Sequence, residues 1–129
     1  MCDKLSDYAL LQDTSVIAKT TQTIIGAEIN VRSYEFITLH FVYTKGDETG
    51  LVITPSFLDT SGGTAYPIGL WTPTANVNAW AAQTYKMTAT TTAYITLDVR
   101  GLAYVKFTQG GSNNDGTPTG TLKASYVLK

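Results

Sequence analysis

The sequence predicts an all-β protein, a single jelly-roll-like β-sandwich of about eight antiparallel strands with an extended N-terminal arm. Three observations favour this class. Stretches in which apolar and polar residues alternate recur at intervals of roughly 8 to 14 residues, with turn-forming residues between them. No stretch has a credible helical pattern of apolar residues. Threonine, whose branched side chain favours strands, is the commonest residue.

The bulk composition indicates one domain whose surface carries few charges. A single domain of 129 residues buries roughly two-thirds of its unfolded surface when it folds. Charged residues make up 15% of the chain, against roughly 25% in an ordinary soluble domain. The net charge is −1 and the nine basic residues are scattered singly, so the sequence predicts no nucleic-acid partner.

Neither a secretion signal nor a membrane span is expected. The N-terminus lacks an apolar core of signal-peptide length, because Leu10 and Leu11 lie between Asp7 and Asp13. No stretch approaches the roughly 20 apolar residues that cross a membrane. We therefore expect a protein that is made in the cytoplasm, with Cys2, its single cysteine, as a free thiol.

The chain is expected to divide into an arm at residues 1–25 and a sandwich domain at residues 26–129. Residues 8–11 fit either a short strand or one helical turn, and the strand is the favoured interpretation. Such an arm packs on a neighbouring subunit or stays disordered, and the sequence leaves both open.

The sandwich is expected to be organised around a strand at residues 36–43. Ile37, Leu39, Phe41 and Tyr43 fall on one face with a period of two. The opposite face is also largely apolar, which predicts a central strand that is covered on both sides.

A polar hairpin loop at residues 44–50 is expected to join this strand to the next, at residues 51–58. Pro55 has no amide donor, so it predicts an edge strand or a bulge at that point. Residues 72–82 read as a long irregular connection. Further strands are expected at residues 26–31, 65–71, 83–89, 93–99, 102–109 and 120–128.

Residues with catalytic or metal-binding chemistry are sparse, and we expect neither an enzyme nor a bound cofactor or metal. His40 is the single histidine and lies in mid-strand. Asp59 and Asp98 could form a glycosidase pair in space, but nothing in the sequence requires it. Residues 113–115, two asparagines and an aspartate, offer oxygen ligands to calcium but lack the spacing of a calcium motif, so a turn is the favoured reading.

Aromatic residues provide the candidate interface or ligand surface. Tyr66, Trp71, Trp80 and Tyr85 cluster in the middle of the chain, where they form a sugar-stacking platform, a protein-binding hot spot or a cap over the core. The residues singled out for a binding role are Tyr66, Trp71 and Trp80, together with Tyr8 of the arm.

Two segments resemble small β-sandwich virion structural proteins of tailed bacteriophages. The first is the strand at 36–43, the loop Thr-Lys-Gly-Asp-Glu-Thr at 44–49 and the strand at 51–58. The second is Tyr-Val-Lys-Phe at 104–107 followed by Gly-Thr-Pro-Thr-Gly-Thr at 116–121 and a terminal strand. The resemblance covers most of residues 26–129 but not the connection at 64–82.

The resemblance implies a capsid decoration (cement) protein on the outer surface of a phage head. Its expected partners are the major capsid protein or another virion protein and further copies of itself, with a trimer as the first guess. The competing interpretation is a carbohydrate-binding β-sandwich, on a phage tail or a secreted enzyme, that uses Trp71 and Trp80. A third reading, a hydrolase, requires a cleft with paired carboxylates.

Overall fold

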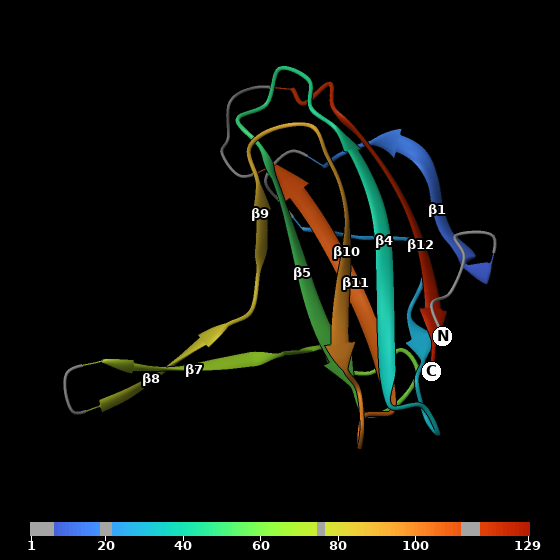
Figure 1. Ribbon diagram of the computed structural model, residues 1–129, viewed down its shortest axis with the longest axis vertical. Coiled ribbons are helices and arrows are strands. Elements are labelled where there is room, and N and C mark those ends of the chain that lie inside the picture. Colours follow the sequence, from blue (N-terminus) through green and yellow to red (C-terminus); the bar gives the residue numbers. More distant parts are fainter. Residues whose placement is uncertain (1–6, 19–21, 75–76, 112–116) are drawn as a thin grey trace.

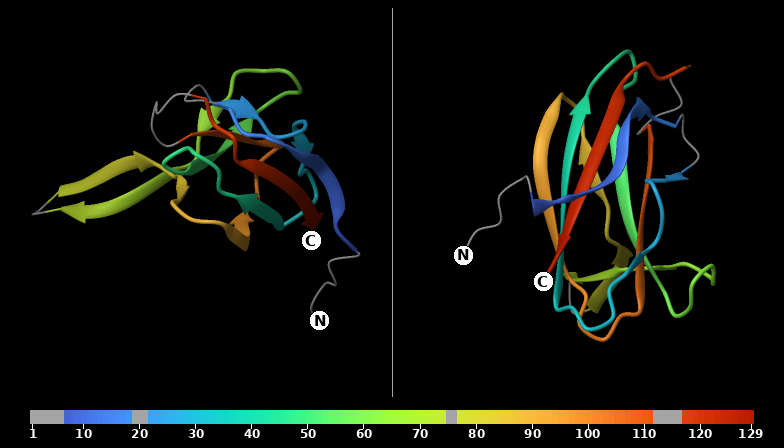
Figure 2. Two further views of the ribbon diagram at one scale, coloured as in Figure 1. Left: turned by 90° about the horizontal axis from the view of Figure 1, so that it is seen from above. Right: turned by 90° about the vertical axis from the view of Figure 1, so that its right-hand side faces the viewer.

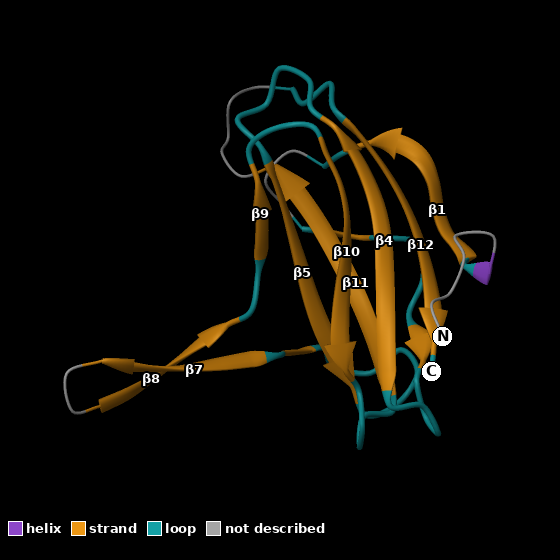
Figure 3. Cartoon of the chain, in the orientation of Figure 1, coloured by secondary structure: helices purple, strands orange, loops and turns teal. Residues whose placement is uncertain are grey.

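The computed structural model describes residues 7–18, 22–74, 77–111 and 117–129. Apart from a short 3-10 turn at Asp7, this part of the chain is built from β-strands and loops, without an α-helix (Figure 3). No helix in it is long and apolar enough to cross a membrane. The predicted all-β class is therefore confirmed.

The strands form a four-stranded and a six-stranded antiparallel sheet, which face each other as the two layers of a sandwich (Figures 1 and 2). The first sheet has the order β1-β12-β4-β10. These strands are β1 (Ala9–Val16), β12 (Thr121–Leu128), β4 (Phe36–Thr44) and β10 (Thr91–Asp98). The predicted sandwich is confirmed.

The second sheet is centred on two long strands, β11 (Tyr104–Gly111) and β5 (Leu51–Leu58). Four short strands flank them: β2 (Thr23–Ile24) and β3 (Ile29–Asn30) pair with β11, and β6 (Tyr66–Pro67) and β9 (Tyr85–Met87) pair with β5. A separate pair, β7 (Gly69–Thr74) and β8 (Val77–Ala82), extends away from the sandwich (Figure 1). These short strands bring the described total to twelve, above the eight expected.

The core lies between the two sheets and is made by the alternate residues that the sequence pattern assigned to it. Ile37, Leu39, Phe41 and Tyr43 of β4 are all buried. Their counterparts across the sandwich include Val105 and Phe107 of β11. β4 lies between β12 and β10, so its prediction as a central strand is confirmed. The predicted cover on both sides is wrong, because the outer face of β4 is only partly covered and leaves Phe36 38% exposed.

Much of the predicted N-terminal arm is part of this chain's own four-stranded sheet. β1 pairs with β12 from Ala9, opposite Tyr126, to Val16, opposite Thr121. Ile17 and Ile25 then enter the core. The division of the chain at residues 25 and 26 stays a prediction, as does packing of an arm on another subunit.

The predicted hairpin of β4 and β5 is wrong, although both strands exist where they were expected. β4 pairs with β12 and β10, whereas β5 pairs with β11, β6 and β9. The loop after β4 therefore crosses between the sheets, which are roughly 10 Å apart. A polar, glycine-containing loop suits a crossing as well as a hairpin, so its composition does not determine which strand becomes the partner.

Pro55 produces neither an edge strand nor a bulge. β5 keeps eight consecutive partners on β11 without a register shift. On its other side it pairs with β9 at Leu51–Ile53 and with β6 at Ser56–Phe57. Pro55 lies in the gap between these two partners, where its missing amide donor removes no ladder bond.

The irregular connection predicted at residues 72–82 is also wrong, because most of it belongs to β7 and β8. Pro73 pairs in register with Asn78. A two-stranded ribbon has a free edge on each strand, so a proline is tolerated there when its nitrogen faces outward. Residues 75 and 76 lie outside the described part of the chain.

A candidate interaction face on the four-stranded sheet

The outer face of the four-stranded sheet carries one row of side chains that crosses all four strands. Leu10 of β1 is the register partner of Ser125, Ser125 of His40, and His40 of Tyr94. Residues directly opposite each other in an antiparallel sheet point to the same face. We call these four residues the cross-strand row.

The two ends of the cross-strand row are exposed and its centre is covered. Leu10 is 57% exposed and Tyr94 is 58% exposed, but His40 is only 8% exposed. Leu10 and Tyr94 are separated by two strands, so whether the face is one apolar patch depends on what covers His40 between them. The cover over His40 identifies the remaining part of the face.

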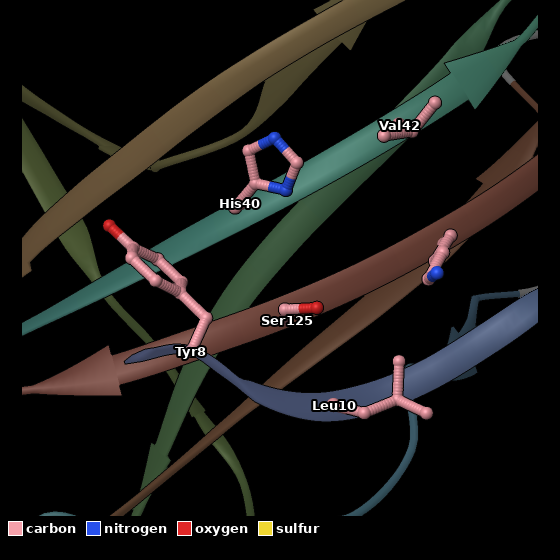
Figure 4. A pocket seen from close by; sticks show the side chains of 6 residues that line it. Tyr8, Leu10, His40, Val42 and Ser125 are labelled. Carbon is pink, nitrogen blue, oxygen red and sulfur yellow. The ribbon is translucent and has the colours of Figure 1, made fainter. Parts of the chain in front are cut away.

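Tyr8 supplies that cover. Its ring centroid lies 6.3 Å from that of His40 and 6.1 Å from that of Tyr94, in edge-on geometry at both contacts. The rings of His40 and Tyr94 are themselves 4.8 Å apart. Tyr8 immediately precedes β1, whose pairing with β12 begins at Ala9, and Figure 4 shows its side chain lying close to His40 of β4.

A hollow of about 400 Å³ opens beside these rings (Figure 4). Its walls come from β1, β12 and β4 and from Tyr8, which immediately precedes β1. The lining residues are Tyr8, Leu10, His40, Val42, Lys123 and Ser125. Aromatic and aliphatic walls with one ammonium group, one imidazole and two hydroxyl groups suit an apolar or aromatic group that carries a hydrogen-bonding atom.

The four residues that the sequence singled out do not come together. Tyr8 lies on the interaction face, whereas Tyr66 is on β6 of the opposite sheet, 46% exposed, with its ring 5.5 Å from that of Phe57. Trp71 and Trp80 are register partners on β7 and β8. For these two tryptophans the structure describes the backbone only.

Sequence reasoning missed His40 and Tyr94 as members of this face. Each strand pattern separately marks its residue as outward-facing. What brings them together is the pairing of β4 with β10, which no local pattern reveals. One feature of the sequence did point to this face. Phe36 and Val42, which share the outward face of β4 with His40, are apolar residues on a side that would ordinarily be polar.

The surroundings of Asp59 and Asp98 do not favour the acid pair that the sequence left open. Asp98 accepts hydrogen bonds from Nε of Arg100 at 3.0 and 3.1 Å, and these bonds lower the pKa of its carboxyl group. A carboxylate held ionised in this way is a poor general acid. Asp59 contributes its backbone oxygen to Arg32, at 3.4 Å.

The other candidate metal-binding or reactive residues lie outside the described part of the chain, or are not gathered into a site within it. Residues 113–115 and Cys2 lie outside the described ranges. Across the described ranges no three His, Cys, Asp or Glu side chains gather in a way that could hold a metal ion.

Comparisons with known proteins bear on the fold. No protein-family model and no curated protein matches the sequence. Among solved structures, the SPBc2 prophage-derived protein YomS superposes with a TM-score of 0.56 at 16% identity, over 94% of this chain and 89% of that one. This likeness shows a common fold.

Two weaker likenesses carry no argument. One is to a structure titled as Bacillus endospore appendages that form disulfide-linked pili, with a TM-score of 0.47, 15% identity and coverage of 98% and 92% of the two chains. The other is to the Gx strain of infectious bursal disease virus, with a TM-score of 0.42 at 15% identity. That likeness covers 95% of this chain but 30% of the viral one.

Proposed function

We propose that this chain is a structural protein of a bacteriophage virion, and that it decorates the outer surface of the capsid. The observation that carries the proposal is the fold shared with a prophage-derived protein over 94% of this chain and 89% of the other. The phage-like segments in the sequence support the same role independently, because they rest on loop composition rather than on the fold.

The interaction face supplies a physical means of attachment. A decoration protein has to be soluble when free and has to bury apolar or aromatic surface when it docks. The face that holds Tyr8, Leu10 and Tyr94 offers such surface on a rigid sheet, and Lys123 is the one charged residue in its hollow. We propose that a side chain of the major capsid protein, or of another virion protein, occupies this hollow.

The test compares assembled particles made with and without the protein. Wild-type particles should contain the chain, and cryo-electron microscopy should show density on the head that vanishes when the gene is deleted. Heads that keep the same surface features and the same thermal stability without the gene would contradict the proposal.

Substitutions on the two opposite sheets test which surface of the protein docks on the head. Leu10→Lys places a charge in the wall of the hollow and should abolish co-sedimentation with heads that lack the protein. Tyr66→Ala changes an exposed aromatic residue on the opposite sheet and should leave co-sedimentation unchanged. Equal binding by wild type and Leu10→Lys would exclude this face.

Carbohydrate binding is the second candidate, and the β7–β8 pair favours it. Its backbone register places Trp71 opposite Trp80 on a ribbon that extends from the body (Figure 1). Aromatic rings are the usual stacking partners of sugars in protein sites. Glycan-array binding that disappears in Trp80→Ala, without co-sedimentation with heads, would favour this function over decoration.

A further inference from the structure

The free edge of β10 differs from the other edges of the sandwich. In the described part of the chain β10 pairs with β4 alone, so one side of an eight-residue strand has no partner strand. Its register with β4 is unbroken from Thr91 to Asp98. The strand contains no lysine, arginine or proline. Such an edge is a template for pairing with another strand.

The opposite edge strand of the same sheet, β1, has irregularities that hinder pairing with another strand, and β10 lacks them. β1 has two register shifts against β12, between Leu10 and Gln12 and between Gln12 and Ser15. Bulges of this kind twist an edge and interrupt its hydrogen-bonding groups. In the six-stranded sheet the flanking strands are only two or three residues long. Among the described strands of the sandwich, β10 is thus the long regular edge.

A second observation lies at the same edge. A hollow of about 420 Å³ follows the seam where β10 of one sheet and β9 of the other do not close. Phe41, Tyr85, Met87, Ala93 and Ile95 form most of its apolar wall. A half-open apolar seam beside an unpaired strand is the kind of surface that a further strand can cover.

We propose that β10 pairs antiparallel with β10 of a second copy of this chain, about a two-fold axis. The pairing joins two four-stranded sheets into one of eight strands, and it brings the seam of each copy against that of the other. A closed two-fold contact of identical strands uses up both free edges, so assembly stops at the dimer. The proposal is independent of the virion role.

The sequence of β10 is compatible with its own copy. Opposed residues of an antiparallel pair share a face, so two central registers are available: Tyr94 opposite Tyr94, or Ile95 opposite Ile95. In the first register Asp98 faces Thr90, and in the second it faces Thr92. Neither register opposes like charges, which is the feature that most strongly prevents edge pairing.

The test uses the full chain in sedimentation equilibrium. Wild type should sediment at twice its 13.9 kDa. Tyr94→Lys places two ammonium groups directly opposite each other in the first register and makes them diagonal neighbours in the second, and it should weaken association by roughly a hundredfold or more. Tyr94→Thr keeps the main-chain pairing and should stay dimeric. Leu10→Lys adds the same charge at the other end of the cross-strand row and should also stay dimeric.

Cysteine cross-linking identifies the strand even if a charged variant fails to fold. In a Cys2→Ser background, Tyr94→Cys should form disulfide-linked dimers under mild oxidation in the first register, and the double variant Tyr94→Cys, Thr96→Cys should form them in either register, whereas Leu10→Cys should not. A wild type that stays at 13.9 kDa at every concentration overturns the proposal. So does a trimer, or a dimer that Tyr94→Lys leaves intact and that cross-links through Leu10→Cys.

Discussion

At the scale of single residues, Glu48 is the buried charge on which the crossing loop depends. It is 2% exposed, and each of its carboxylate oxygens accepts two hydrogen bonds. One oxygen receives the hydroxyl of Tyr43 at 2.5 Å and the amide of Gly46 at 2.8 Å. The other receives the amides of Thr119 at 3.2 Å and Gly120 at 2.8 Å. The side chain thereby ties the loop after β4 to the segment that leads into β12.

We expect Glu48→Gln to destabilise the fold although it preserves shape. Glutamine offers one acceptor oxygen, and its NH₂ group would face backbone amides that need an acceptor. Leaving a buried amide unpaired costs on the order of 3 kcal/mol, which corresponds to a fall in the melting temperature of about 10 °C. Differential scanning calorimetry measures this. Asp47→Asn, at the exposed neighbouring position, should change the melting temperature little.

The same carboxylate should determine part of the acid sensitivity. Burial by itself raises the pKa of Glu48, but the hydrogen bonds from Tyr43, Gly46 and Gly120 outweigh burial and lower it from 4.5 to about 2. A lowered folded-state pKa stabilises the fold above the unfolded value, and that contribution is lost as the pH falls from 4.5 through 2.

Urea unfolding at a series of acid pH values checks this sign. We expect the free energy of unfolding of wild type to fall by on the order of 3 kcal/mol more than that of Glu48→Gln across this range. Parallel pH profiles for the two proteins would show that Glu48 is not the titrating group.

Two features of the structure require glycine at position 26. Its φ of +64° lies in the left-handed region, and a Cβ atom there would lie 2.1 Å from the carbonyl oxygen of Leu11 in β1. Gly62 has a similar φ of +71°, but a Cβ atom there would meet nothing within 4 Å. The two glycines therefore separate backbone strain from steric conflict.

We expect Gly62→Ala to cost about 1 kcal/mol from backbone strain alone. Gly26→Ala should cost at least about 3 kcal/mol, because the Leu11 backbone has to move and the pairing of β1 is disturbed. Chemical denaturation of both variants gives the comparison. Equal losses would mean that β1 adjusts freely, and would weaken the view that it is an integral strand.

At the scale of elements, the extents and faces of the long strands other than β1 could be predicted, and their partners could not. The alternation of Ile95, Leu97 and Val99 with Tyr94 and Thr96 identifies buried and outward residues correctly, because the two-residue period of a strand is a local property. Which strand lies alongside is decided by packing across the whole sandwich. For that reason the sequence predicts β4 and β5 in the right places but wrongly predicts that they pair with each other.

The candidate site shows the same limit. Tyr8 was singled out from the sequence, but its partners His40 and Tyr94 come from β4 and β10, and their assembly depends on the register between these strands. The two-stranded β7–β8 ribbon was missed because Pro73 interrupts its pattern. A proline argues against a central strand, but a ribbon has only edge strands.

At the scale of the whole molecule, the two edge strands of the four-stranded sheet, β1 and β10, have different roles. Leu10 of β1 and the preceding Tyr8 form one wall of the hollow, and the register shifts of β1 blunt that edge. β10 stays straight and open on the other side. In the proposed dimer the two interaction faces form one continuous surface on an eight-stranded sheet, which would present two docking sites to a virion lattice.

A dimer whose chains unfold together should melt at a temperature that depends on protein concentration. Mass action favours the associated folded state as the concentration rises. With an unfolding enthalpy near 0.7 kcal/mol per residue for both chains, a hundredfold increase should raise the melting temperature by on the order of 5 °C. Tyr94→Lys should lose this dependence at concentrations below its weakened dissociation constant, whereas Leu10→Lys should retain the wild-type dependence. Because this measurement responds to association and not to attachment, a concentration-independent wild type would remove the dimer while leaving the docking face untouched.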